Sequence, residues 1–113
     1  MTKQQLKDDY ERETKRVVEI IIQKYKPEKI VAFGSTATGN VNPDSDIDLL
    51  VIKKTVKKFW ERVKEVLLLV KTRRSFDVSV FTPQEIQQAY RKDYYFITEE
   101  MLEKGKTLYE RKA

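Results

Sequence analysis

The chain has 113 residues, with 23 Lys and Arg against 18 Asp and Glu, a net charge of +5, and neither His nor Cys. This length and a hydrophobic content of 40% predict one packed domain over residues 1–113 rather than a disordered chain. The absence of Cys and His excludes thiolate nucleophiles, disulfides, Cys/His zinc sites and imidazole bases. The longest apolar run, Val66–Val70, is too short to cross a membrane, and no secretory leader is evident, which favours the cytoplasm.

The first half of the chain predicts a helix, a strand, a loop and a second strand. Apolar residues recur every three or four positions over 4–25, which is typical of an amphipathic helix, and Pro27 ends it. The apolar segment 29–33 is stopped by Gly34 and predicts a strand. Residues 34–45 are rich in Gly, Asn and Pro and predict a loop. The segment 46–52 predicts a central strand, because it is apolar on both faces after its first three residues.

The second half alternates in the same way. Helical spacing predicts a second long helix over about 56–71, and alternation over 76–81 predicts a third strand. Thr82–Glu85 is a capping box that begins a helix ending near Arg91. A short helix over 98–104, closed by Gly105, and an extended piece over 107–110 complete the chain. The fold class is therefore α/β (α+β), with a small mixed sheet of about three core strands flanked by helices.

Three aspartates lie at the starts of predicted strands. Asp46 and Asp48 are two residues apart and point to the same side of one strand, and Asp77 begins the next strand. A helix connects these two strands, as parallel neighbours require, so the three carboxylates should lie together. The first strand can run antiparallel to the second, which would bring Gly34 and Ser35 to the same edge.

Three carboxylates at one edge favour a divalent cation. Each close pair repels by about 4 kcal/mol at about 4 Å with an effective dielectric of about 20. Mg²⁺ prefers oxygen ligands and is commonly held by a few carboxylates together with substrate phosphates. Two aspartates shared by two ions, with a third on one ion, suit two-metal nucleotidyl transfer. Taken one at a time, however, strand-end aspartates and a glycine turn are also ordinary structural features.

The spacing of these residues resembles the signature of a known family. Gly34-Ser35, ten residues and then Asp46-Ile47-Asp48 are similar to the motif of polymerase-beta-type nucleotidyltransferases, whose third aspartate lies on a following strand, as Asp77 does. The small size and the ending Gly-Lys-Thr-Leu-Tyr-Glu over 105–110 resemble the minimal nucleotidyltransferase subfamily, often encoded beside a helical HEPN partner.

The resemblance implies roles for the motif residues. Asp46, Asp48 and Asp77 would be catalytic and would hold two Mg²⁺ ions, and Gly34 and Ser35 would seat the phosphates of ATP. Many members carry arginine inside the glycine loop, whereas this chain has threonine at positions 36 and 38. That difference weakens the expected hold of the loop on a triphosphate.

The basic residues are concentrated between Lys53 and Arg74, where nine positive and two negative side chains give +7. Lys71, Arg73 and Arg74 precede the third strand and are candidates for nucleotide or acceptor contacts, although a purely solvent-exposed role is equally compatible with the sequence. The cluster Lys53, Lys54, Lys57 and Lys58 should lie at the far end of the sheet. The aromatic cluster 94–96 could stack a base, but such a cluster beside a short helix is more typical of core.

The resemblance implies a Mg²⁺-dependent enzyme that transfers AMP from ATP to a hydroxyl of a macromolecule. We expect a macromolecular acceptor because the motif-bearing elements occupy most of the chain, leaving no acceptor-binding domain. The family favours a tyrosine of a HEPN-type toxin, which would make the chain its antitoxin. Two alternatives are a catalytically weak partner-binding antitoxin module and a nucleic-acid-binding or RNA-tailing protein; the sequence has a basic segment but no evident RNA-reading motif.

Overall fold

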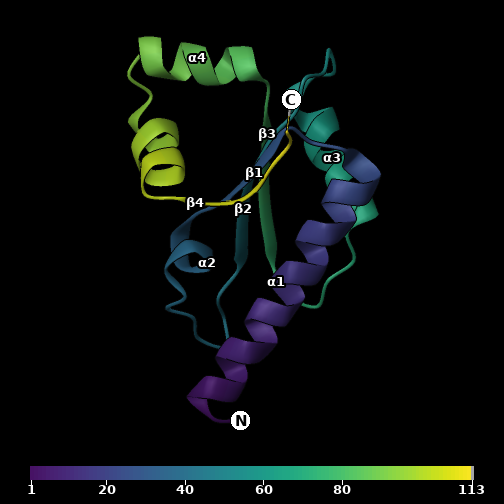
Figure 1. Cartoon of the computed structure of the whole chain (residues 1–113), viewed down its shortest axis with the longest axis vertical. Helices are drawn as coiled ribbons and strands as arrows, with labels where there is room; N and C mark the ends of the chain where they lie inside the picture. The colour runs from purple at the N-terminus through teal and green to yellow at the C-terminus, as the bar shows by residue number, and fades with distance from the viewer. Residues whose placement is uncertain (113) are drawn as a thin grey trace.

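The computed structural model describes residues 1–112 as a sheet with helices on both faces (Figure 1). In chain order, the elements are α1 (Lys3–Tyr25), β1 (Lys29–Ala32), α2 (Gly34–Thr38), β2 (Ile47–Ile52), α3 (Phe59–Leu69), β3 (Phe76–Phe81), α4 (Pro83–Arg91), the π-helix η1 (Phe96–Glu103) and β4 (Lys106–Glu110). The predicted mixed α and β class is confirmed. None of the helices in the described chain is long and apolar enough to span a membrane.

The sheet has four strands in the order β3-β2-β1-β4. β2 runs parallel to β3 and β1 runs antiparallel to β2, which confirms the predicted directions of these three strands. β1 also runs antiparallel to β4. The three predicted core strands are confirmed, and the sheet has a fourth strand at its edge. The terminal segment that was expected only to be extended pairs with β1 as an edge strand, with a bulge between Ile30 and Val31.

Each face of the sheet is covered by its own pair of helices. α1 and α3 pack against the face that carries Ile47, Leu49 and Val51, which belong to the larger core cluster. α4 and η1 cover the other face, where Leu50 and Ile52 belong to a smaller cluster. Because side chains alternate along a strand, Asp48 lies on the same face as Leu50.

Two predicted boundaries differ from the structure. The second long helix begins at Phe59 rather than near 56, because Val56 is fully exposed and Lys58 has extended backbone at the N-cap. The last short helix is a π-helix over Phe96–Glu103, and Gly105 follows it at a close approach to β1. A Cβ at Gly105 would lie 2.1 Å from the Met101 carbonyl oxygen, so only glycine fits this turn.

The expectation that the aromatic cluster at 94–96 belongs to the core was wrong. Tyr94, Tyr95 and Phe96 are 50%, 61% and 65% exposed. They follow the end of α4, where Asp93 takes a positive φ and turns the chain towards η1. The core on this face is filled instead by residues from inside η1, with Met101 as its buried centre.

A buried arginine joins α3 to the beginning of α4. The Arg62 guanidinium donates to the carbonyl oxygens of Lys57 and Val80, at 2.8 and 3.2 Å, and to Glu85 Oε1 at 2.7 Å. Burial alone would raise the pKa of Glu85, but its hydrogen bonds to Arg62 and to the Thr82 backbone outweigh burial and lower it. Glu85 also closes the capping box of α4, so one ion pair fixes two elements.

We therefore expect Arg62→Met to lower the free energy of unfolding by about 2–4 kcal/mol, because it removes an ion pair and leaves the buried Val80 carbonyl oxygen without its side-chain donor. Urea unfolding at neutral pH measures this change. Lys64→Met, on the exposed side of the same helix, is the control and should change stability by less than about 0.5 kcal/mol. Equal effects of the two substitutions would contradict a structural role for the Arg62 ion pair.

Candidate functional site

The three aspartates meet where β2 and β3 begin. The parallel register pairs Asp48 with Asp77, and Asp46 lies just before β2 begins at Ile47. The predicted placement of Asp77 beside the other two is therefore correct. Asp46 and Asp77 are exposed, whereas Asp48 is partly buried. The carboxylates thus occupy an accessible edge of the sheet.

Gly34 lies against Asp48. Its φ is +59°, and a Cβ built on it would lie only 2.7 Å from Asp48 Oδ2. Any other residue at this position would be strained by its backbone and would collide with the carboxylate. The glycine of the predicted motif is thus required for the close approach of the chain to the second aspartate.

The segment 34–45 was expected to be a loop, but its first five residues, Gly34–Thr38, form α2. Gly39 ends this helix in the left-handed conformation, with φ +76°, and its N–H donates to the Ser35 carbonyl oxygen at 2.9 Å. Two glycines separated by four residues thus enclose little more than one helical turn. Ser35 lies in the first turn of α2, next to Gly34.

A chain of hydrogen bonds ties α2 to the start of β2 and to α1. The backbone N–H of Asp48 donates to Thr36 Oγ1 at 2.8 Å, and Thr36 Oγ1 lies 2.6 Å from the Tyr10 hydroxyl. Tyr10 donates to the Asp46 carbonyl oxygen, also at 2.6 Å. A tyrosine hydroxyl has one hydrogen, so Thr36 is the donor in the middle bond. The bonds therefore run from Asp48 through both hydroxyls and return to Asp46.

The sequence offered only part of this arrangement. Tyr10 fits the apolar stripe of α1, and it is indeed 2% exposed, but nothing in its spacing indicates a hydroxyl contact with residue 46. Thr36 is notable in the sequence only because arginine is common there in the family that the chain resembles. The structure gives that threonine two hydrogen-bond partners, the Tyr10 hydroxyl and the Asp48 backbone N–H.

Burial and neighbouring negative charges both act on the Asp48 carboxylate. Burial, and then the charges of Asp77 and Asp46, raise its pKa from 3.8 to about 6. Near neutral pH this carboxylate is charged, although burial and the two neighbouring aspartates destabilise its charged form. A cation bound at this edge would reduce the repulsion.

The carboxylates do not form a ready-made three-ligand metal site. Within residues 1–112, no three acidic side chains converge closely enough to hold an ion. The expected three-aspartate site is thus not assembled by these side chains alone. Carboxylates on adjacent strands, together with phosphate oxygens and water, still suit Mg²⁺, which seldom uses a complete protein cage.

The three basic candidates before β3 have different surroundings. Arg74 is mostly buried, lies 3.5 Å from Asp9 and stacks over the Tyr10 ring at 4.9 Å. Arg73 is exposed and, with Arg74, borders a hollow of about 310 Å³ beside Asp44 and Ser45. Lys71 is exposed and borders a different hollow, beside Arg16, which donates to its carbonyl oxygen. Arg73 is therefore the exposed cation that lies beside the segment leading to Asp46.

The lysine cluster after β2 lies at the opposite end of the sheet from the aspartates, as predicted. Lys53 donates to the Tyr25 carbonyl oxygen, and its ammonium lies 4.3 Å from the centre of the Tyr25 ring. Lys57 Nζ is 3.1 Å from Glu65. These two lysines stabilise the fold locally, so the basic segment is less available to a polyanion than its charge indicates.

Comparisons with known proteins agree with this arrangement. The sequence model of the family described as "Nucleotidyltransferase domain" matches residues 14–107. The fold is similar to that of spectinomycin adenyltransferase AAD(9) from Enterococcus faecialis, solved with ATP and spectinomycin, with a TM-score of 0.60 and 16% identity. The alignment covers 90% of this chain but 57% of that enzyme. No curated protein sequence matches the chain.

We expect Tyr10→Phe to lower the free energy of unfolding by about 1–3 kcal/mol, because it removes two hydrogen bonds and leaves the Asp46 carbonyl oxygen without its donor. Tyr25→Phe is the matched control, because the Tyr25 hydroxyl has no hydrogen-bond partner within residues 1–112, although the ring is equally buried. Chemical denaturation of both variants measures the difference. A larger loss in the Tyr25 variant would show that the hydroxyl chain is unimportant.

Asp48→Asn should stabilise the protein in EDTA by about 1–2 kcal/mol at about pH 7.5. The folded-state pKa is about 6 and lies above the ordinary value of 3.8, so the destabilisation by Asp48 develops as the pH rises between these values and is absent below them. The gain should therefore disappear near pH 4. Thermal unfolding at several pH values tests this, with Asp44→Asn in the exposed loop as the control. A gain independent of pH would rule out repulsion as its cause.

Proposed function

The chain belongs to the nucleotidyltransferase domain family, and from this premise we propose that it transfers AMP from ATP to a hydroxyl of a protein. The observation that carries the proposal is the pairing of Asp48 with Asp77 in parallel register, with Asp46 just before them and Gly34 in contact with Asp48. A phosphate chain entering this exposed edge would meet carboxylates on one side and the beginning of α2 on the other.

Asp46 and Asp48 are the residues that would hold Mg²⁺, with Asp77 beside one of two such ions. When bound, the ions would neutralise charge that develops on the transferring phosphoryl group. Gly34 leaves room for phosphate oxygens, and Ser35 in the next position offers a hydroxyl to them. Arg73 is exposed beside this edge and is available to the outer phosphates, whereas Arg74 already contacts Asp9 and Tyr10.

The reaction is an in-line displacement at the α-phosphorus. The acceptor oxygen forms a bond to that phosphorus while the bond to the bridging oxygen of the β-phosphate breaks, and pyrophosphate leaves with the electron pair. The hydroxyl proton passes to the Asp77 carboxylate and then to water. Asp77 suits this role because it is exposed and its strand position is directly opposite Asp48.

The acceptor that we propose is a tyrosine of a HEPN-type toxin, which the modification would inactivate, so that this chain acts as its antitoxin. The aspartate edge is open rather than enclosed, which suits an acceptor carried on a large partner. Support for a small-molecule acceptor is weaker, because this chain aligns with 57% of the enzyme that was solved with spectinomycin and has no counterpart in the alignment for the rest of it.

A partner-binding module with weak catalysis is the alternative that a specific observation favours. On α3, the side chains of Trp60, Leu67 and Leu68 are 62%, 46% and 70% exposed. A group of large apolar side chains on one helix is typical of a protein interface. In addition, Thr36 is engaged by Tyr10 and Asp48, so α2 lacks the cation that many relatives offer at this position.

Incubation with α-labelled ATP, Mg²⁺ and the protein product of the adjacent gene should transfer label to that partner. Asp46→Asn/Asp48→Asn should reduce the labelling rate by at least about 100-fold, because removing charge stabilisation at a transferring phosphoryl group costs several kcal/mol. Omitting Mg²⁺ should have a similar effect. Mass spectrometry of the partner identifies the modified tyrosine.

Asp44→Asn provides a matched control, since it removes an exposed aspartate two residues before the motif. This variant should label the partner at nearly the wild-type rate. If the double aspartate variant protects cells from the toxin as well as the wild type does, without labelling, the chain acts by contact and the enzymatic proposal fails.

A further inference from the structure

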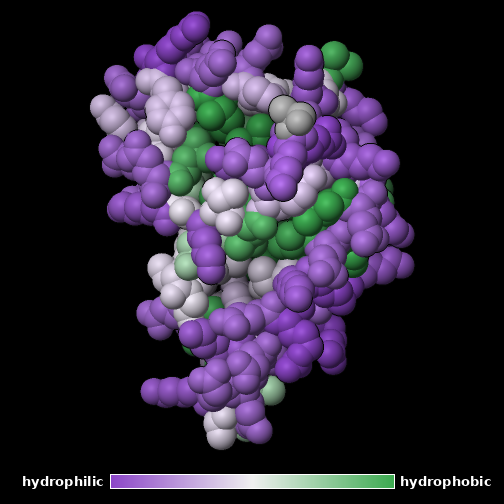
Figure 2. Space-filling view, in the orientation of Figure 1, coloured by the Kyte–Doolittle hydropathy of each residue, from purple (hydrophilic) through white to green (hydrophobic). Residues whose placement is uncertain are grey.

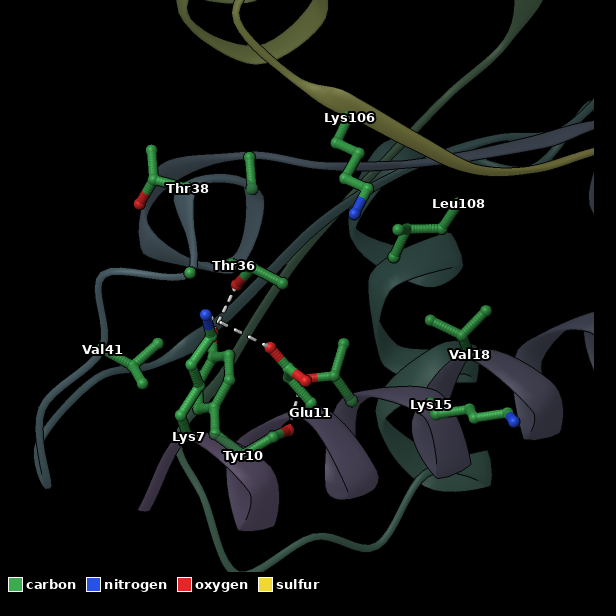
Figure 3. A pocket seen from close by; sticks show the side chains of 13 residues that line it. Lys7, Tyr10, Glu11, Lys15, Val18, Thr36, Thr38, Val41, Lys106 and Leu108 are labelled. Atoms are coloured by element: carbon green, nitrogen blue, oxygen red, sulfur yellow. Dashed lines mark hydrogen bonds and ion pairs between the residues drawn. The ribbon is translucent and has the colours of Figure 1, made fainter. Parts of the chain in front are cut away.

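A cavity of about 440 Å³ lies between α1, α2 and β4 (Figure 3). Its volume is within the range of about 300–1,000 Å³ that small-molecule sites occupy. None of the three aspartates lines it. The function proposed above makes no use of this cavity.

Positive charge dominates the lining. Lys7 and Lys15 of α1 and Lys106 of β4 border the cavity, and Glu11 is the one acidic residue among the lining side chains of the described chain. Lys7 lies 4.0 Å from Glu11, but neither Lys15 nor Lys106 has an ion-pair partner within residues 1–112. Figure 3 shows the Lys106 side chain extending from β4 towards the cavity, opposite α1. The unpaired ammonium groups thus stand on two different walls.

The cavity also has an apolar wall. Val18 of α1 and Leu108 of β4 face it, with Val41 on the other side. Figure 2 shows the corresponding strip of hydrophobic surface in the hollow between β4 and α1, bordered by hydrophilic side chains. A ligand that matches both features carries a negative group and an apolar body.

α2 separates this cavity from the aspartates. Gly34, at the start of α2, contacts Asp48, whereas residues 36–39 line the cavity. Asp48 lies on the face of the sheet covered by α4 and η1, while α1 covers the opposite face. Tyr10 and Thr36 line the cavity and also form the hydroxyl chain. A molecule in the cavity would therefore contact Tyr10 and Thr36, which hold the backbone near the aspartates, without touching the three carboxylates themselves.

We propose that this cavity is a second binding site, for a small organic phosphate whose phosphoryl group lies between Lys106 and the α1 lysines and whose apolar body covers Val18 and Leu108. Lysine ammonium groups bind phosphate as point charges and do not need the planar geometry of arginine. This proposal does not depend on nucleotidyl transfer.

AMP is the probe, with inorganic phosphate and adenosine as its two fragments, and binding is measured by calorimetry without divalent cations. Lys106→Met should weaken AMP binding by about fivefold or more, because it removes one charge-assisted contact while keeping the aliphatic stem. Each fragment should bind at least about tenfold more weakly than AMP, and added salt should weaken AMP binding.

Two control variants separate this site from its surroundings. Lys24→Met removes an exposed lysine of α1 outside the cavity and should leave AMP binding unchanged. Asp46→Asn/Asp48→Asn should also retain binding, even if it abolishes nucleotidyl transfer. In the wild-type protein, AMP should shift the backbone NMR signals of Val18, Thr38 and Leu108.

Three results would overturn the proposal. The first is loss of AMP binding in the aspartate variant together with retention in Lys106→Met, which would place the nucleotide at the sheet edge. The second is the absence of AMP binding to the folded wild-type protein at millimolar concentration. The third is equal binding of AMP and inorganic phosphate, which would show that the apolar wall takes no part.

Discussion

The chain of hydroxyl hydrogen bonds through Thr36 and Tyr10 is the interaction on which the geometry of the aspartate edge depends. It begins at the Asp48 amide and ends at the Asp46 carbonyl oxygen, so it fixes the backbone on both sides of Ile47. Since it passes through α2 and α1, the same bonds set the distance of Gly34 from Asp48. Tyr10 is itself held from the other side by Arg74, which stacks on its ring.

Because these hydrogen bonds pass through Thr36, the threonine at this position has a structural role. A long cationic side chain at this position would have to leave the space between Tyr10 and β2, and both hydroxyl contacts would be lost. The Thr36 side chain is therefore committed to the backbone of β2 and to Tyr10, and it brings no positive charge to α2. Positive charge for a bound triphosphate has to come from elsewhere, and Arg73 is an exposed basic residue beside Asp44 and Ser45.

The sequence predicts the strands and their directions well because each depends on local pattern and connection length. The crossover helix requires β2 and β3 to be parallel, and this alone places Asp77 next to Asp48. The pairing of the terminal extended piece as a fourth strand was not predicted, because β4 is an exposed edge with no apolar alternation. The helix α2 was not predicted either, because it has hardly more than one turn. The Tyr10 contact joins residues 36 positions apart, which periodicity cannot reveal.

Burial, and then the charges of Asp77 and Asp46, raise the pKa of Asp48 and so destabilise its charged form. The like charges of Asp48 and Asp77 repel each other, because the parallel register holds their strand positions side by side. Binding of a cation and phosphates would remove this repulsion and so stabilise the folded chain by mass action. Because the hydroxyl chain fixes the backbone beforehand, that binding needs to reorganise only side chains, which is the condition for rapid assembly of a reactive site at an open sheet edge.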